Sequence, residues 1–316
     1  NKKMKFKKLG TVVALVVSAV VLTACGTNDK EKFIKDSAIL AKSSTQKFNF
    51  KTDDLKVIAS GDAEAYAPII NGYLSSIKLS GKSLTDGKNA QVNMDISLAG
   101  QEIPLEIVTK DTNAYLKLET LKPILDIYLQ SSGDDLSSKG LDMTKIKGKY
   151  LDLNAISEEN GQETEAVSSL DAEASKKALD NAYNSLDKTD FSKEGSAITM
   201  TLSGDQLAKF VKAYLSELPK KSRESFDDLL KDKDFEKTLP EVIKALTITV
   251  DSKNKTSNVV LKFTGKEVQG YGLGGKLSYN VTYSNEKVSV TIPSKGNLIK
   301  STSELSELIS NSSQFN

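Results

Sequence analysis

The side chains that most often perform chemistry in proteins are sparse in this chain of 316 residues. The chain has no histidine and one cysteine, Cys25. Without imidazole it lacks the usual general base near neutral pH, which excludes Ser-His-Asp and Cys-His catalysis. Two Ser-x-x-Lys pairs, at 44–47 and 185–188, have the spacing of a penicillin-binding nucleophile, but no Ser-Asp-Asn or Lys-Thr-Gly element accompanies them. We interpret both pairs as structural, and we expect no enzymatic activity, no metal site and no cofactor.

Cys25 stands in a context that predicts a chemical modification. Lysines at positions 2, 3, 5, 7 and 8 precede an apolar run over residues 9–21, and Leu22, Thr23 and Ala24 then lead directly into Cys25. The order is that of a signal peptide, and the last four residues resemble a bacterial lipobox. In that pathway the thiol sulfur receives a diacylglyceryl group, and cleavage leaves Cys25 as the first mature residue.

The same segment predicts where the protein is found. The apolar run is shorter than the roughly 20 residues that a membrane span needs. We therefore expect residues 1–24 to be a lipoprotein signal peptide and residues 25–31 to be a lipidated tether. One acyl chain binds only marginally, so two or three would hold the protein at the outer face of the cell membrane. An ordinary secretory signal or a marginal anchor helix is the alternative interpretation.

Composition narrows the range of partners. Five of the 43 basic residues and none of the 42 acidic residues lie in the first 24 positions, which leaves 38 basic residues and a net charge of −4 beyond them. This balance argues against nucleic acid, which needs a concentrated basic face. Arg223 is the single arginine in the sequence, so bidentate clamps on phosphate are almost unavailable.

Two parts of the chain show the period-2 alternation of apolar residues that predicts strands. The first part comprises residues 48–57, 77–79, 92–98, 103–107 and 114–118. The second comprises residues 246–250, 259–263, 277–283 and 288–292. Turn residues separate these runs, so each part predicts an antiparallel meander with one apolar face.

Helical spacing of apolar residues predicts the remaining elements. Helices are expected over residues 30–45, 121–130, 171–186, 205–215 and around 226–230. The fourth begins after Ser203-Gly204-Asp205 and carries its apolar stripe from Leu207 to Leu215. A last helix is expected near Ser301, because Ser301-x-x-Glu304 has the form of a capping box.

A glycine-rich segment, residues 270–275, resembles a phosphate-binding loop. Such a loop must connect a strand to the first turn of a helix. Strands are predicted on both sides here, so we interpret the segment as a hairpin or bulge.

The element order predicts an α+β fold. We expect a large curved antiparallel sheet, a half-barrel, with helices covering one face, as a single domain over residues 32–316. Such a sheet encloses either a packed core or a cavity. If it encloses a cavity, the residues expected to line it are the apolar side chains Met94, Ile96, Leu105, Ile107, Leu116, Ile248, Phe263 and Tyr279.

The order of elements resembles a group of Gram-positive surface lipoproteins with LolA/LppX-like, lipoprotein-carrier-like architecture. The segments that carry the resemblance are the first helix running into Phe48-Asn49-Phe50, then Ala114-Tyr115-Leu116-Lys117, then residues 196–215, and finally residues 288–293 before a polar helix. The resemblance implies a half-barrel whose concave side, covered by helices, holds acyl chains. It implies no functional residue, because that architecture has no short signature to match.

Two functions are compatible with these observations. The first is a membrane-anchored extracytoplasmic protein that binds a hydrophobic or lipid-like ligand, with the membrane and an apolar small molecule as its partners. The second is a non-enzymatic surface lipoprotein that binds a protein or a wall polymer, in an adhesion, accessory or envelope-stress role. A cavity in the folded protein favours the first function, and dense packing favours the second.

Overall fold

A computed structural model describes residues 28–98, 100–160, 172–220, 223, 235–268 and 270–310. Leu22, Thr23, Ala24 and Cys25 lie outside the described residues, as does the helix expected around 226–230. The strands are β1 (Thr45–Ala59), β2 (Lys78–Thr85), β3 (Asn89–Leu98), β4 (Gln101–Lys110), β5 (Asn113–Lys117), β6 (Tyr150–Asp152), β7 (Phe191–Glu194), β8 (Ala197–Ser203), β9 (Ile243–Asp251), β10 (Thr256–Phe263), β11 (Glu267–Val268), β12 (Tyr271–Ser284) and β13 (Leu298–Ile299). The helices are α2 (Asp29–Ala41), α3 (Ala67–Ser76), α4 (Leu121–Ser131), α5 (Leu153–Glu159), α6 (Ala172–Asn184), α7 (Gly204–Glu217), α10 (Phe235–Val242) and α11 (Thr302–Ile309).

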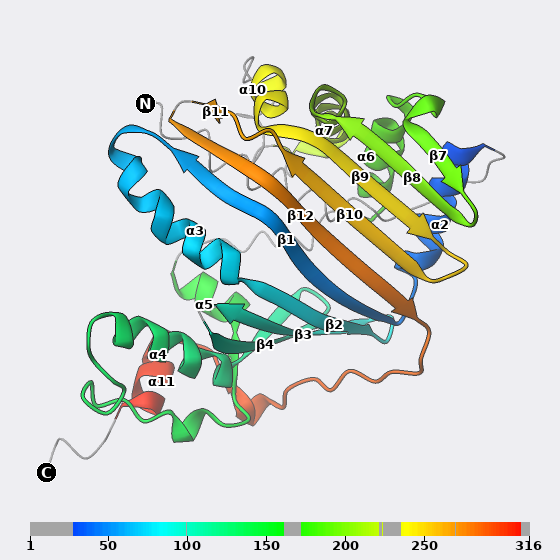
Figure 1. The fold of residues 1–316 in the computed structure, drawn as a ribbon. Coiled ribbons are helices and arrows are strands. Elements are labelled where there is room, and N and C mark those ends of the chain that lie inside the picture. The colour runs from blue at the N-terminus through cyan, green and yellow to red at the C-terminus, as the bar shows by residue number, and fades with distance from the viewer. Residues whose placement is uncertain are drawn as a thin grey trace, which may run out of the picture. The chain divides into compact units, whose positions relative to one another are not determined.

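The strands form one open sheet, shown in Figure 1. Over the described residues its order is β13-β6-β5-β4-β3-β2-β1-β12-β10-β9-β8-β7, with β11 paired to β12. From β2 to β6 each strand pairs antiparallel with the next, as do β7 with β8, β8 with β9, β9 with β10, β10 with β12 and β11 with β12, whereas β13 runs parallel to β6. The predicted α+β class with an open, curved antiparallel sheet is therefore confirmed.

Contacts between residues group the chain into two compact units. Unit 1 contains the described residues of Asn1–Ser43, Phe50–Ser75 and Leu170–Tyr283. Unit 2 contains those of Ser44–Asn49, Ser76–Ser169 and Ser284–Asn316. The long strand β1 contributes to both, and the single domain expected over 32–316 stays a prediction.

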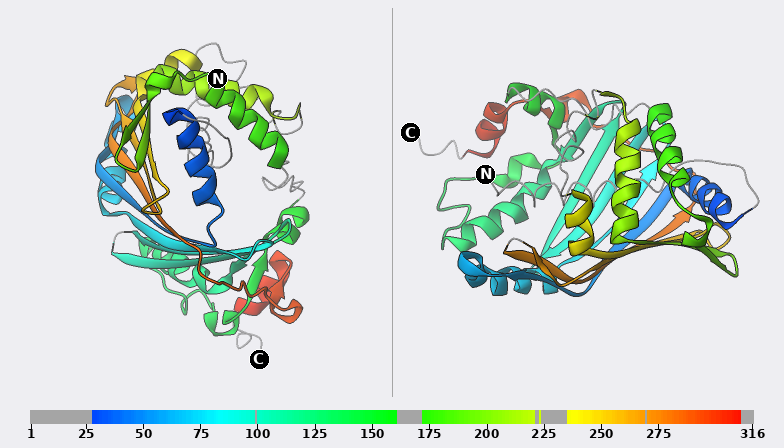
Figure 2. Two further views of the ribbon diagram at one scale, coloured as in Figure 1. Left: turned by 90° about the vertical axis from the view of Figure 1, so that its right-hand side faces the viewer. Right: turned by 90° about the horizontal axis from the view of Figure 1, so that it is seen from above.

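Unit 1 has a continuous hydrophobic core on one face of its strands. Helices α2, α6 and α7 lie on the same side of β7–β10 (Figure 2). Phe33 of α2 makes edge contacts with Tyr183 and Phe191, with ring centroids 6.1 and 5.4 Å apart. The alternating buried positions of β8 and β9 complete the layer, so the period-2 pattern places apolar residues on the helix-covered face.

The predicted helix of residues 205–215 is confirmed as α7. Ser203 and Gln206 form a capping box at its first turn. Leu207, Phe210, Val211 and Leu215 are buried, as their spacing predicts. Gly204 is required where the helix starts, because a Cβ there would overlap the carbonyl oxygen of Ile243.

Unit 2 has a smaller core of its own. Leu118, Met143 and Ile146 are buried in it, and partly buried residues of α4, β6, β13 and α11 pack around them. Its sheet follows the predicted meander through β3, β4 and β5 with continuous register. The predicted turn between β3 and β4 is present, with Gly100 at a φ of 79°.

One predicted strand is wrong. Residues 288–292 alternate apolar and polar side chains but form no strand, and at least one of their amides bonds a side chain instead of a strand backbone. The Val290 amide instead donates to the Asp86 carboxylate at 3.4 Å, and Val290 is buried by its contacts in that irregular segment. The helix after it is confirmed: Ser301 accepts from the Glu304 amide at the start of α11.

Helix α3 is an element that the sequence patterns did not predict. Its Asn71 side chain accepts from the Val57 amide at 2.7 Å and donates to the Val57 carbonyl at 2.9 Å. The amide side chain therefore satisfies both backbone groups of Val57 on β1, as a paired strand residue would.

Replacing the Asn71 side chain should lower the stability of the contact between α3 and β1. We expect Asn71→Ala to lower the free energy of unfolding by about 2 kcal/mol, because two hydrogen bonds to backbone are lost together. Urea titration measures the change, and Ser75→Ala on the exposed side of the same helix is the control. An Asn71→Ala variant as stable as the control would contradict this role.

Candidate functional site

Five of the eight residues predicted to line a cavity lie together in unit 2. Met94 of β3 stands opposite Leu105 of β4, and Ile107 of β4 stands opposite Leu116 of β5. Ile96 is two residues beyond Met94 and therefore on the same side of the sheet. We call these five residues the apolar face, and each keeps part of its surface exposed.

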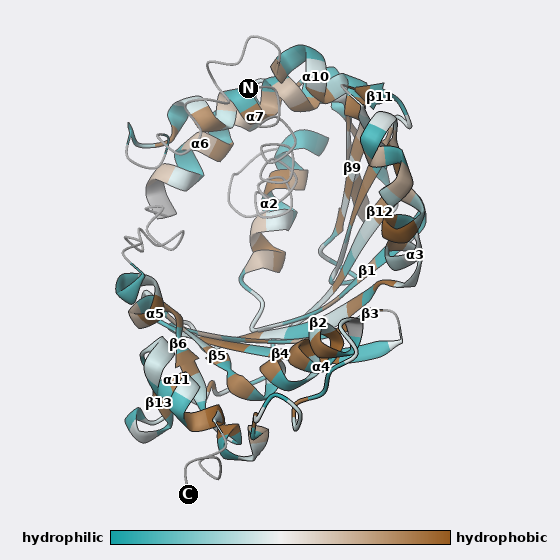
Figure 3. Cartoon of the chain, turned by 90° about the vertical axis from the view of Figure 1, so that its left-hand side faces the viewer, coloured by the Kyte–Doolittle hydropathy of each residue, from teal (hydrophilic) through white to brown (hydrophobic). Residues whose placement is uncertain are grey.

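The small core of unit 2 covers part of this face. Leu116 stands opposite Leu151, which packs into that core together with Leu121 and Leu125 of α4. Figure 3 shows the hydrophobic residues of α4 in brown. Ile124 of this helix is 43 % exposed, so the helix adds an accessible apolar side chain beside the sheet.

The other three predicted residues lie in unit 1 and serve packing. Ile248 is 3 % exposed in the main core. Phe263 and Tyr279 are partly buried and pack against that core, and the Tyr279 ring lies 4.6 Å from the Phe50 ring. A ligand-lining role for these three residues stays a prediction.

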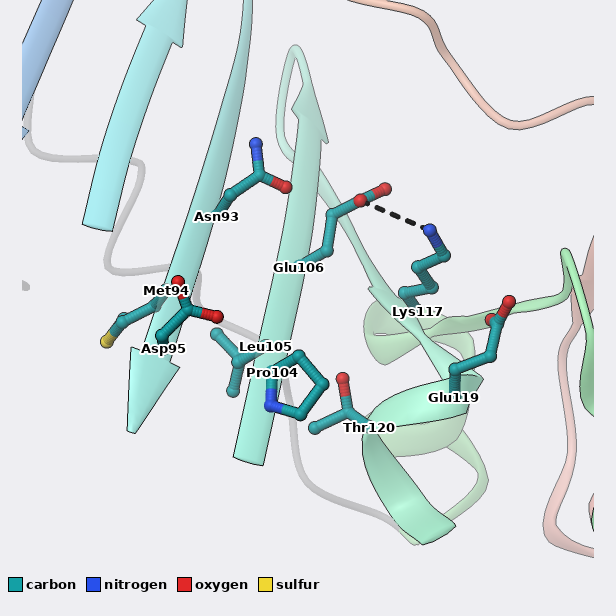
Figure 4. Close-up of a pocket in the computed structure, with 9 residues that line it drawn as sticks. All are labelled: Asn93, Met94, Asp95, Pro104, Leu105, Glu106, Lys117, Glu119 and Thr120. Atoms are coloured by element: carbon teal, nitrogen blue, oxygen red, sulfur yellow. Dashed lines mark hydrogen bonds and ion pairs between the residues drawn. The ribbon is translucent and has the colours of Figure 1, made fainter. Parts of the chain in front are cut away.

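A pocket of about 230 Å³ lies in unit 2 along β3, β4 and the end of β5, and it shares Met94 and Leu105 with the apolar face (Figure 4). We call it the polar pocket. Its lining residues are Asn93, Met94, Asp95, Pro104, Leu105, Glu106, Lys117, Glu119 and Thr120. Asn93, Asp95, Pro104 and Glu106 alternate with the residues of the apolar face, so their side chains point to the other side of the sheet.

Glu106 is the best-satisfied acid of the polar pocket. Its Oε2 atom pairs with the Lys117 ammonium at 3.3 Å, and its Oε1 atom accepts from the Tyr150 hydroxyl at 2.6 Å. Both oxygens are thus held, and this carboxylate is fixed in position on the sheet.

Only one of the two carboxylate oxygens of Glu119 has a hydrogen-bond donor. Its Oε1 atom accepts from the Gly148 amide at 3.1 Å, while its Oε2 atom is buried without a hydrogen-bond partner. Burial, the hydrogen bond to Glu106 and the charges of Glu106 and Glu119 together raise the pKa of Tyr150. Tyr150 therefore stays a neutral donor beside these two acids.

The serines and the glycine-rich segment singled out in the sequence have defined surroundings in the described residues. No group of three histidine, cysteine or acidic side chains among them is placed to hold a metal ion. Of the Ser-x-x-Lys serines, the Ser44 hydroxyl donates to the Glu286 carbonyl and the Ser185 hydroxyl to the Ala182 carbonyl, both at 2.6 Å. The segment 270–275 enters β12 from a hairpin with β11, as expected, and no helix follows it.

The acids and lysine of the polar pocket were not predicted as site residues. Asp95, Glu106 and Lys117 occupy polar positions between the apolar residues of β3, β4 and β5, and Glu119 lies in the turn that follows β5. Alternation places these strand side chains on one face of the sheet, but whether Glu106 lies beside Lys117 depends on the register of β4 and β5. The pairing of β5 with β6 then adds Tyr150 opposite Lys117.

Comparison with known proteins assigns no relative. No protein-family model matches this sequence, and no curated protein matches it either.

The buried tyrosines predict a pH dependence of stability. Burial and the neighbouring Tyr283 raise the pKa of Tyr279 to about 12. The ordinary pKa of tyrosine in an unfolded chain is about 10, so the unfolded state releases this proton first as the pH rises. The stability that the neutral phenol contributes is present below pH ~10 and is lost between about 10 and about 12.

We therefore expect Tyr279→Phe to lose less stability than the wild type across this window. Urea unfolding at several pH values measures the difference. Equal losses in the two proteins would contradict the assignment.

Proposed function

We propose that this chain is a lipoprotein, anchored by acylated Cys25 to the outer face of the cell membrane, that binds an apolar, lipid-like ligand without catalysis. The apolar face of unit 2 carries the proposal. A group of neighbouring apolar side chains that stays only partly covered offers a surface to an apolar ligand.

The start of the folded body supports the anchor. Asn28 caps α2 by accepting from the Glu31 amide at 3.1 Å, and its own amide is bonded by the Glu31 carboxylate at 3.4 Å. This cap lies three residues after Cys25. An extended tether of that length spans about 10 Å, so acylation would hold α2 close to the membrane surface.

The chemistry of the apolar face supports an acyl ligand. Met94, Leu105 and Ile107 present flexible and branched aliphatic side chains next to one another. Each methylene of a ligand that is buried on such a surface contributes about 0.8 kcal/mol. The described part of the chain has no helix long and apolar enough to cross a bilayer.

A second candidate function is binding of a wall polymer. The face of the unit 1 sheet that α2, α6 and α7 leave uncovered carries a cross-strand row of uncharged polar residues. In register order the row is Thr199, Thr249, Asn258 and Asn280. Within it, the two threonine hydroxyls lie 2.9 Å apart and the two asparagines share a bond of 2.6 Å. Hydroxyl and amide groups can both donate to and accept from a polyhydroxylated chain.

Acylation is tested by metabolic labelling with a clickable palmitate. We expect the wild-type protein to be labelled and to sediment with membranes, and Cys25→Ala to be unlabelled. Equal labelling of the two proteins, or none in the wild type, would exclude the anchor.

Ligand binding is tested on the Cys25→Ala protein, which cannot fill the site with its own acyl chains. Purified without detergent, it should bind a fluorescent fatty acid, and Met94→Lys should weaken binding about tenfold or more because a charge would be buried. Gln91→Lys, on the opposite face of the same strand, is the matched control. Absence of fatty-acid binding, or an equal effect of the two lysines, would contradict the proposal.

A further inference from the structure

Helix α3 and the residue before it carry a group of exposed apolar side chains. Tyr66, Ile69, Ile70 and Tyr73, which we call the α3 stripe, are 64, 59, 42 and 49 % exposed. They are four of the eight large apolar side chains that are exposed among the described residues. The helix buries none of its own residues. A helix in a folded protein normally turns its apolar stripe toward a core, so the α3 stripe has the form of a contact surface.

The hydrogen bonds of Asn71 set the direction in which the stripe points. Asn71 binds both backbone groups of Val57, so its side of α3 faces β1, and the helix lies beside that strand in Figure 1. Ile69 and Tyr73 are each two residues from Asn71, which is about 200° around the helix. The other two members share their side by the spacing i, i+3, i+4 and i+7. The stripe therefore faces away from the sheet.

The composition of this segment favours a protein partner over a lipid surface. No charged residue occurs from Ala65 to Ile77, although charged residues make up 27 % of the chain. Amphipathic helices that lie on membranes are rich in lysine and arginine on their polar side, and α3 has neither. Patches that are rich in tyrosine and poor in charge are typical of the centre of protein interfaces.

The absence of charge also favours a second copy of this chain as the partner. In a two-fold contact the same patch faces itself, so a charged patch would oppose its own charges. With their exposed fractions, the four side chains of the stripe offer roughly 400 Å² of surface. Two copies together would bury about twice that area, which is at the low end for a specific interface. This area suits a weak, reversible dimer.

We propose that α3 is a self-association surface, at which two copies of this chain pair helix against helix about a two-fold axis. Ile69 and Ile70 are the middle residues of the stripe, so the axis passes beside them. The ridges formed by i and i+4 side chains, here Tyr66 with Ile70 and Ile69 with Tyr73, pack between the ridges of the other copy. The association depends neither on acylation of Cys25 nor on the ligand proposed for unit 2.

Sedimentation velocity of the Cys25→Ala chain, purified without detergent, tests the proposal. We expect a monomer–dimer equilibrium with a dissociation constant on the order of 100 μM. Ile69→Lys should weaken association about tenfold or more, because two ammonium groups would meet near the axis. Ile39→Lys makes the same change on α2, at a side chain that is 50 % exposed, and should leave the equilibrium unchanged.

Exchanging the sign of the charge identifies the partner as a second copy. Ile69→Glu alone should be as weakly associated as Ile69→Lys, whereas an equimolar mixture of the two should recover the dimer because opposite charges then face each other. Since α3 buries none of its residues, both variants should keep the urea midpoint of the parent protein in dilute solution.

Three results would overturn the proposal. They are a monomeric Cys25→Ala parent across a concentration range that brackets the expected constant, unchanged association in Ile69→Lys, and no recovery in the mixture. Vesicles of phosphatidylglycerol test the other occupant. If a monomeric parent bound these vesicles and Ile69→Lys did not, the stripe would belong to a lipid surface. Fatty-acid binding should be the same in all these variants, which keeps this test distinct from that of the apolar face.

Discussion

Alternation of side chains along β3, β4 and β5 is the constraint on which both candidate sites depend. Because successive residues point to opposite faces, a short sheet that packs Leu116 beside a small core must present Glu106 and Lys117 on its other side. A register slip of one residue would exchange the two faces and bury the acids. The pairings Met94 with Leu105 and Ile107 with Leu116 therefore fix the apolar face and the polar pocket together.

Glu106 and Glu119 of the polar pocket differ in how many of their carboxylate oxygens are hydrogen-bonded. Glu106 has a cation and a phenol on its two oxygens, so it contributes fixed negative charge at little cost in unsatisfied polarity. Glu119 has an amide on one oxygen and nothing on the other. The buried oxygen that lacks a donor lowers the stability of the fold.

Much of this arrangement was predictable from the sequence, and the part that was not has physical causes. The stripe from Leu207 to Leu215 and the alternation in β3–β5 act within single elements, so periodicity alone locates them. The pairing of Lys117 with Glu106 depends on strand register, and Tyr150 reaches Glu106 only because β6 joins β5 from 33 residues further along the chain. Residues 288–292 have the pattern of a strand, but the Val290 amide bonds the Asp86 side chain, and α3 bonds β1 through Asn71, a contact that periodicity cannot reveal.

Helix α2 connects the proposed anchor to the stable part of unit 1. Phe33 is fully buried among aromatic rings, and the Lys30 ammonium donates to the Leu186 carbonyl at 2.7 Å, 156 residues away in sequence. Burial lowers the pKa of Lys30, while the nearby Asp187 and Asp190 oppose that shift, so this contact joins the helix to the loop after α6 by charge as well as by hydrogen bonding. The described fold therefore begins in a helix that is fixed in the core of unit 1. If Cys25 is acylated, the three residues from Cys25 to Asn28 keep the first turn of this helix within about 10 Å of the membrane surface.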